Sequence, residues 1–204
     1  VAYTCNEMKI PATIFMPVTT PQQKISQVKF FGGDYVTIRL TGDTFDESAR
    51  AALDFAKETE KTFIDPFDDE NVQAGQGTVA VEILEQADQQ GIAFDQILIP
   101  VGGGGLIAGV AMAIKSINPT IKVIGVQSEN VHGMAASFYA GTMTNHRTSS
   151  TLADGCDVAR PGSLTFEIVK QLVDDIVLVT EDDIRHSMVD MIQRNKIITE
   201  GAGA

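Results

Sequence analysis

The chain has 204 residues, 44% of them hydrophobic, and a formal net charge of −12 at pH 7. This length supplies a core for one large or two small domains, and the negative charge argues against nucleic acid as a partner. Apolar runs are broken well before the ~20 residues that a membrane-spanning helix needs, so we expect no membrane partner. Cys5 and Cys156 form no C-x-x-C pair and the N-terminus has no secretory pattern, so we expect a cytoplasmic protein.

Helices and strands alternate over the first 64 residues. Apolar periodicity, a proline at a helix start and a capping box formed by Thr44 and Glu47 define the elements. The predicted order is helix 1–9, strand 12–16, helix 20–33, strand 35–40, helix 44–56 and strand 62–64. This alternation predicts a parallel sheet with helices packed on it.

An acidic segment, Asp65-Pro66-Phe67-Asp68-Asp69-Glu70, interrupts this alternation. We interpret it as the boundary between two such units, a smaller αβ domain at residues 1–64 and a larger domain at residues 65–204. Its carboxylates form a weak metal motif, since acidic residues before a helix more often cap it. We therefore expect helix caps in a solvated loop and no metal site.

The second domain continues the alternation of helices and strands. Its predicted elements are helix 71–90, strand 97–101, helix 106–115, strand 121–126, helix 134–140, loop 141–161, helix 164–174, strand 176–179 and a helix from 181. Gly75 and Gly77 lie in the first turns of helix 71–90, where each glycine costs about 1 kcal/mol relative to alanine, so we expect close backbone packing there. The fold class is α/β, with two open parallel-sheet domains and helices on both faces.

Four consecutive glycines, Gly102, Gly103, Gly104 and Gly105, connect the strand that ends at Val101 to the helix that starts at Leu106. Glycines let the backbone adopt positive φ and let a ligand approach closely. The loop N–H groups and the positive end of the helix favour an anion, most often phosphate. A flexible linker is the alternative, but its flanks would be polar.

The glycine loop also satisfies a second phosphate-binding pattern. Gly103, Gly105 and Ala108 fit the loose G-x-G-x-x-A fingerprint of dinucleotide-binding folds, and Glu129 follows the next strand where a ribose-binding acid would lie. A nicotinamide dehydrogenase is therefore a rival hypothesis. An uninterrupted row of glycines instead favours a single terminal phosphate monoester.

The segment Pro100 to Leu106, followed by Ala108-Gly109, resembles the phosphate loop of the fold-type II pyridoxal-phosphate enzymes, the tryptophan-synthase β-like family. Four further segments narrow the resemblance to the threonine dehydratase (threonine ammonia-lyase) group within that family. They are Asp65-Pro66-Phe67-Asp68-Asp69-Glu70, Ala74-Gly75-Gln76-Gly77-Thr78, Leu152-Ala153-Asp154-Gly155 and Thr199-Glu200-Gly201-Ala202-Gly203.

The resemblance implies pyridoxal 5′-phosphate as cofactor and a lyase that converts L-threonine, with L-serine as an alternative substrate, into a 2-oxo acid and ammonia. In the group this reaction opens isoleucine biosynthesis or serves catabolism. Position by position, it implies that the cofactor phosphate is held by Gly102, Gly103, Gly104, Gly105 and the N–H of Leu106. Gly155 would lie beside the cofactor ring and Glu200 would be a catalytic carboxylate near it, although a surface carboxylate at a helix end is an equal alternative for Glu200. The resemblance also implies that residues 1–64 are a small mobile domain, that residues 65–204 bind the pyridoxal phosphate, and that the protein is a homo-oligomer.

Several segments typical of the family have no counterpart here. No lysine stands in the Ser-x-Lys context that holds the cofactor covalently, the Ser-x-Gly-Asn-His segment is absent, and so is a polar partner for the pyridine nitrogen. We therefore expect an internal fragment, incomplete at both ends, without dehydratase activity of its own.

Other members of the family remain alternatives. Serine dehydratases and serine racemases are related, and the racemase type carries a carboxylate metal site where this chain has Gln127 and Gly133. We therefore expect no metal there, with a site that uses Glu129 as the alternative. A non-enzymatic alternative is an inactive fragment that binds phosphate or pyridoxal phosphate.

Overall fold

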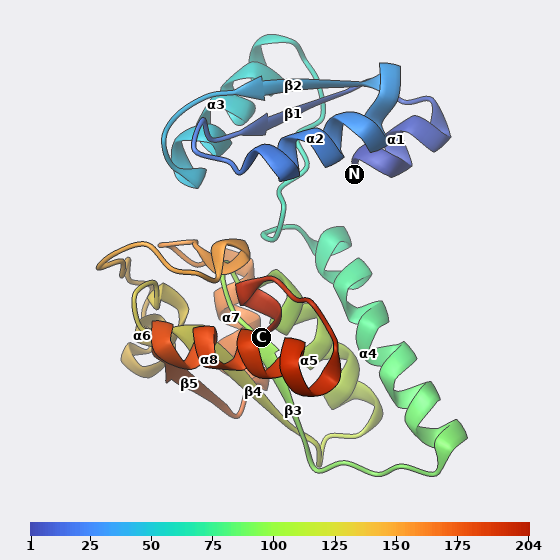
Figure 1. Ribbon diagram of the computed structural model, residues 1–204, viewed down its shortest axis with the longest axis vertical. Helices are drawn as coiled ribbons and strands as arrows, with labels where there is room; N and C mark the ends of the chain where they lie inside the picture. The colour runs from blue at the N-terminus through green and yellow to red at the C-terminus, as the bar shows by residue number, and fades with distance from the viewer. The chain divides into compact units, whose positions relative to one another are not determined.

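The computed structural model describes residues 1–204 as two compact units, Val1–Ile64 and Asp65–Ala204. The N-terminal unit alternates helices and strands (Figure 1). Its elements are α1 (Ala2–Met8), β1 (Ala12–Met16), α2 (Gln22–Gly32), the 3₁₀ turn η1 (Gly33–Tyr35), β2 (Val36–Leu40) and α3 (Phe45–Glu58). The two strands pair in parallel, from Ala12 opposite Val36 to Met16 opposite Leu40, which is the pairing that a βαβ unit requires.

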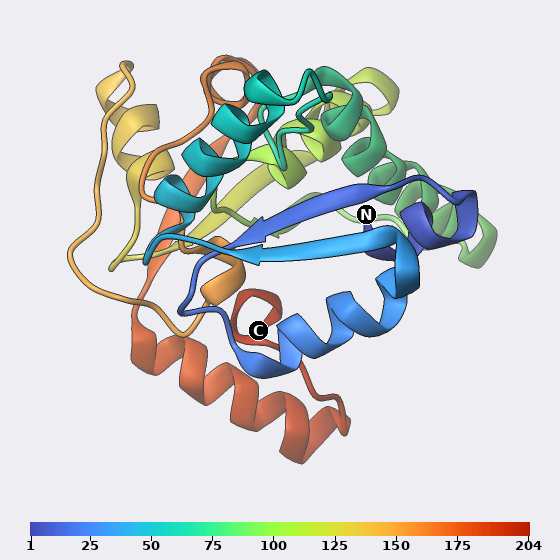
Figure 2. The same ribbon diagram turned by 90° about the horizontal axis from the view of Figure 1, so that it is seen from above.

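Helices cover both faces of this two-stranded sheet. Figure 2 shows α2 and α3 on opposite sides of β1 and β2. On the α3 side, the ring of Phe15 in β1 lies 5.5 Å from the ring of Phe55. The capping box predicted for α3 is present: Thr44 Oγ1 accepts a hydrogen bond from the Glu47 N–H at 3.3 Å, and Glu47 accepts one from the Thr44 N–H. The start of α3 is therefore fixed by its own sequence.

The strand predicted at residues 62–64 is wrong. These residues have no regular secondary structure and pair with neither β1 nor β2. Ile64 is 61% exposed, so the apolar run does not mark a buried strand. A strand needs a neighbour to take its hydrogen bonds, and sequence pattern alone carries no information about that neighbour.

The C-terminal unit is built on a three-stranded parallel sheet in the order β3-β4-β5. Its regular elements are α4 (Glu70–Gln90), β3 (Gln96–Pro100), α5 (Gly105–Ile117), β4 (Lys122–Ser128), α6 (Gly133–Ala140), α7 (Ser163–Leu172), β5 (Asp175–Val179) and α8 (Glu181–Asp190). Short turns η2 (Asp154–Cys156), η3 (Met191–Asn195) and η4 (Gly201–Gly203) complete it. The helices and strands predicted from the sequence for this part of the chain are present, with ends shifted by one or two residues.

The core of this unit lies between α5 and one face of the sheet. The α5 side chains Ile107 and Ile114 are fully buried, and so, to within a few per cent, are Ile99, Val123 and Ile176 from the three strands. A helix that is apolar on all sides must be enclosed. The sheet covers one side of α5, and α4 and α7 also pack against it. The sheet and its covering helices thus hold the start of α5 in a fixed place.

Glycines bring α4 and α5 into backbone contact. A Cβ atom added to Gly109 of α5 would overlap the carbonyl oxygen of Gln73 and lie 2.8 Å from the amide nitrogen of Gly77. A Cβ added to Gly77 would lie 3.0 Å from the Gly109 oxygen. Gly77 therefore serves the close packing expected for it, whereas Gly75 has no atom within 4 Å of a Cβ position and does not. None of the helices combines the length and apolar character required to cross a lipid bilayer.

Candidate anion-binding site

The glycine loop connects β3 to α5 at the carboxyl end of the sheet. Gly104 has φ of 97° and ψ of 0° and precedes the first residue of α5. A residue with a side chain rarely adopts this backbone conformation. A Cβ at Gly104 would also lie 2.9 Å from Cβ of Thr165, so both the conformation and the space require glycine.

The other three glycines are required because neighbours crowd them. A Cβ at Gly102 would lie 3.0 Å from Cα of Cys156. One at Gly103 would lie 2.7 Å from the ring of Phe67, and one at Gly105 would lie 2.8 Å from Cβ of the same residue. The loop is therefore packed on both sides and is not a flexible linker.

The backbone N–H groups of this loop have no partners in the chain. None of the six residues 102–107 donates a backbone hydrogen bond, and the first N–H of α5 that does so is that of Ala108, to the oxygen of Gly104. Gly103, Gly104, Gly105 and Ile107 are buried. Buried N–H groups without partners are rare in proteins. With the positive end of an uncapped helix beside them, they form a site that an anion would satisfy.

Two other segments that the resemblance in sequence singled out, those of Gly155 and Glu200, lie close to this loop. Gly155 sits in the turn η2, and its neighbour Cys156 packs against Gly102. A Cβ at Gly155 would lie 3.2 Å from Oε1 of Glu200. The structure thus places the glycine loop, the Asp154–Cys156 turn and Glu200 in one continuous group.

The packing of Cys156 against Gly102 was not predicted from the sequence. Burial, with the negative charges of Glu200 and Asp154, raises the pKa of its thiol to about 11. The thiol therefore stays protonated at neutral pH and is a poor nucleophile. Its contribution at this site is packing against the loop.

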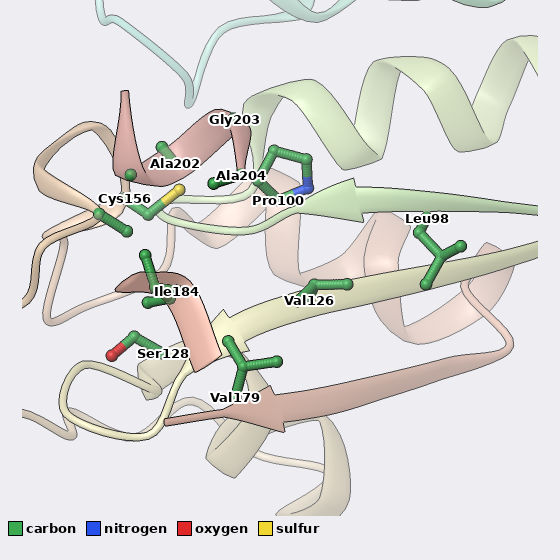
Figure 3. Close-up of a pocket in the computed structure, with 12 residues that line it drawn as sticks. Leu98, Pro100, Val126, Ser128, Cys156, Val179, Ile184, Ala202, Gly203 and Ala204 are labelled. Atoms are coloured by element: carbon green, nitrogen blue, oxygen red, sulfur yellow. The ribbon is translucent and has the colours of Figure 1, made fainter. Parts of the chain in front are cut away.

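A pocket of about 210 Å³ adjoins the site on the face of the sheet opposite α5. In Figure 3, Leu98, Val126 and Val179 come from the three strands, and Ile184 of α8 and Cys156 lie at its wall. The remaining lining residues are Pro100, Ser128, Ala153, Gly201, Ala202, Gly203 and Ala204. The pocket is predominantly apolar, and none of the four loop glycines lines it.

The acidic segment supplies helix caps and turns. Asp65 Oδ1 accepts hydrogen bonds from the N–H groups of Phe67 and Asp68, and Asp69 Oδ1 caps α4. The Asp68 carboxylate caps α7 by accepting from residues 163, 164 and 165. No group of three or more His, Cys, Asp or Glu side chains is placed to hold a metal ion. The hydrogen bonds accepted by Asp65, Asp68 and Asp69 match the helix-cap interpretation of the segment.

Gln127 and Gly133 have structural contacts. The buried Gln127 accepts a hydrogen bond at Oε1 from the N–H of Ala135, at 2.9 Å. A Cβ at Gly133 would overlap the carbonyl oxygen of Ala159. Both residues therefore help to seat α6 and the loop that follows it.

The long loop 141–161 is tied to the sheet through Glu181. Its Oε1 accepts from Ser128 Oγ and its Oε2 from the N–H of Leu152, both at 2.7 Å. Burial raises the pKa of Glu181, but hydrogen bonds from Leu152, Ser128 and Thr151, with the charge of Arg185, outweigh it and hold the pKa below its ordinary value of 4.5. The carboxylate therefore stabilises the fold above that value and loses this effect as the pH falls through the lowered pKa.

We expect Glu181→Gln to weaken the acid sensitivity of loop 141–161. The wild-type loop should lose protection against amide hydrogen exchange below pH 4.5, and the variant should lose less, because its side chain no longer titrates. Asp182→Asn is the matched control, since Asp182 is exposed and pairs only with Arg185. Equal acid sensitivity in wild type and Glu181→Gln would contradict the assignment.

Comparisons with known proteins agree with this architecture. A family model described as "Pyridoxal-phosphate dependent enzyme" matches residues 1–204. The chain is 53% identical over its whole length to the catabolic L-threonine dehydratase TdcB of Escherichia coli K12, of which it covers 60%. The processed form of threonine deaminase isoform 2 from Solanum lycopersicum superimposes with a TM-score of 0.89 at 39% identity, covering 100% of this chain and 54% of that one. Maize serine racemase gives 0.90 at 33% identity, covering 100% and 60%.

Proposed function

The chain belongs to the family of pyridoxal-phosphate-dependent enzymes, whose model matches it throughout, and on that premise we propose that it serves the dehydration of L-threonine to 2-oxobutanoate and ammonia. The observation that carries the proposal is the row of unpartnered N–H groups from Gly102 to Ile107, four of which belong to buried residues. The chain spans about 60% of the length of the curated relatives it matches. The activity therefore belongs to the protein of which these residues form the cofactor-binding part.

The residues present fit the phosphate of the cofactor. A phosphate monoester carries a charge of about −1.5 to −2 at neutral pH and several acceptor oxygens. The N–H groups of residues 102–106 would donate to those oxygens, and the start of α5 would offset the charge. Gly155 would give the ring room because it has no side chain, and Glu200, beside Gly155, would place a carboxylate near the ring.

Bound there, the cofactor would withdraw electrons from the α-carbon of the substrate, which eases loss of the α-proton and of the β-hydroxyl. The C-terminal unit supplies no lysine amine at the loop. Three of its lysines donate instead to the carbonyl oxygens of Ile121, Gly141 and Gln193. The fourth, Lys122, begins β4 at the opposite end of the strands from the loop. No lysine of the whole chain, including those of the N-terminal unit, stands in the Ser-x-Lys context of the family. We therefore propose that these 204 residues alone would bind the cofactor without turning over threonine.

L-Threonine is favoured over L-serine because relatives at 52–53% identity, and a solved structure at 39% identity, are named for threonine. The preference need not be strong, since one methyl group is worth only ~1–3 kcal/mol in a pocket. Relatives at 52–53% identity are named catabolic, which favours a catabolic role over isoleucine biosynthesis. We extend the proposal to a homo-oligomeric, cytoplasmic enzyme.

Two preparations test the proposal. Protein expressed from the natural reading frame should carry a visible cofactor band that changes with L-threonine, and it should release 2-oxobutanoate. The 204-residue chain should bind pyridoxal 5′-phosphate reversibly and release none. A natural protein with no cofactor band, or with a band indifferent to threonine and serine, would contradict the proposed reaction. Turnover by the 204-residue chain would contradict the proposal that none of its lysines forms the covalent bond to the cofactor.

A further inference from the structure

One carbonyl of the glycine loop is held by two donors from α7 and the residue before it. The Gly103 oxygen accepts from the Thr165 hydroxyl at 2.7 Å and from the N–H of Gly162 at 3.2 Å. The same hydroxyl lies 3.1 Å from the Gly162 oxygen, so the Gly103 oxygen is the nearer of its two acceptors. Thr165 is fully buried. No other carbonyl between Gly102 and Gly105 accepts a side-chain hydrogen bond. The direction of the Gly103 carbonyl is therefore fixed from outside the loop.

Fixing this carbonyl also fixes an N–H group. The peptide bond between Gly103 and Gly104 is trans, as are all others in the chain. Because a trans peptide unit is planar, the Gly103 C=O and the Gly104 N–H point in opposite directions. With the carbonyl turned toward Thr165, the Gly104 N–H is turned away from α7, where it has no partner in the chain. Glycines on both sides of this bond would otherwise let the peptide plane rotate.

The N-terminus of the neighbouring helix α7 is already capped by a carboxylate, so its N–H groups are not available to an anion. Asp68 places its carboxylate on the N–H groups of Ser163, Leu164 and Thr165 at 2.8–3.2 Å. The start of α5 has no such side-chain cap. Of the two helix starts beside the loop, only that of α5 is therefore left for a ligand.

We propose that Thr165 is a positioning residue for phosphate, which holds the Gly103–Gly104 peptide so that the Gly104 N–H faces the anion. The inference rests on the proposed function, in which this loop binds the cofactor phosphate. Thr165 itself does not touch the ligand. Asp68 supports it by holding the first turn of α7 in place.

The test compares Thr165→Val, which removes the hydroxyl at nearly constant volume, with Thr165→Ser, which keeps it. The probes are pyridoxal 5′-phosphate and pyridoxal, with binding to the 204-residue chain measured by equilibrium dialysis. Thr165→Val should weaken pyridoxal 5′-phosphate about tenfold, a loss typical of removing a hydrogen bond that orients a ligand group. It should leave the affinity for pyridoxal unchanged, and Thr165→Ser should restore phosphate affinity.

Ser137→Ala is the matched control for losing a buried hydroxyl. Ser137 Oγ is fully buried and donates to the Gly133 oxygen at 2.6 Å, in α6. This variant should lose stability without losing phosphate affinity. If Thr165→Val loses no more phosphate affinity than Ser137→Ala, or loses affinity for both probes alike, the positioning role is wrong.

A measurement on the wild type covers the case in which Thr165→Val does not fold. Addition of pyridoxal 5′-phosphate should shift the amide resonance of Gly104 and slow its hydrogen exchange, and pyridoxal should do neither. A wild type that binds pyridoxal 5′-phosphate with an unchanged Gly104 amide overturns the role of Thr165 alone. A wild type that binds no phosphate compound overturns the phosphate site, and the inference with it.

Discussion

Replacing Gly109 by alanine should destabilise the C-terminal unit by about 2 kcal/mol or more. The new methyl group would overlap the Gln73 carbonyl and lie 2.8 Å from the Gly77 nitrogen. These are backbone atoms, so α4 and α5 would have to move apart, and overpacking of this kind typically costs ~1–3 kcal/mol or more. The better helix propensity of alanine offsets up to about 1 kcal/mol of that loss. Urea unfolding followed by circular dichroism measures the difference.

Gly75→Ala is the control on the same helix. Gly75 is exposed and a Cβ there would meet nothing within 4 Å, so this change should raise the free energy of unfolding by up to about 1 kcal/mol. The two substitutions are chemically identical and should act with opposite signs. A Gly109→Ala protein as stable as Gly75→Ala would show that the two helices do not meet as described.

Gly104→Ala should weaken binding of pyridoxal 5′-phosphate about a hundredfold, which corresponds to losing one or two hydrogen bonds to a charged group at ~1.5–3 kcal/mol each. At φ of 97° an alanine is strained, and its methyl group would lie 2.9 Å from Cβ of Thr165. Relief of both requires the loop to turn, which would misdirect the free N–H groups. Equilibrium dialysis with pyridoxal 5′-phosphate measures the loss.

Gly141→Ala separates this effect from general backbone strain. Gly141 also has positive φ, 71°, but lies at the end of α6 with nothing within 4 Å of a Cβ. It should lose stability while keeping its affinity for pyridoxal 5′-phosphate. If Gly104→Ala retains wild-type affinity, or if Gly141→Ala loses as much, the loop is not the phosphate site.

Local sequence signals determined most of the elements. Four glycines between an apolar strand and an apolar helix specify the β3-loop-α5 unit without help from the rest of the chain, and the capping box at Thr44 fixes the start of α3. Residues 62–64 also have an apolar local pattern, but they form no strand because no neighbouring strand pairs with them. A strand depends on pairing with a distant segment, which a single sequence does not reveal.

The candidate site divides in the same way. The loop itself was predicted from the sequence, because its conformation follows from glycines and a helix start. The contact of Thr165 with Gly103 spans 62 positions, and the burial of Cys156 against Gly102 likewise arises only in the folded chain. No sequence signal marked either residue. The roles of Gly155 and Glu200 toward a cofactor remain predictions.

The most direct test of the central claim is phosphorus NMR of pyridoxal 5′-phosphate titrated with the 204-residue chain. If the glycine loop holds a phosphate monoester, the phosphorus signal should change saturably, inorganic phosphate should reverse the change, and NAD should not. A signal that never changes would contradict the phosphate site. Saturable binding of NAD, with no binding of pyridoxal 5′-phosphate, would instead support a dinucleotide-binding protein.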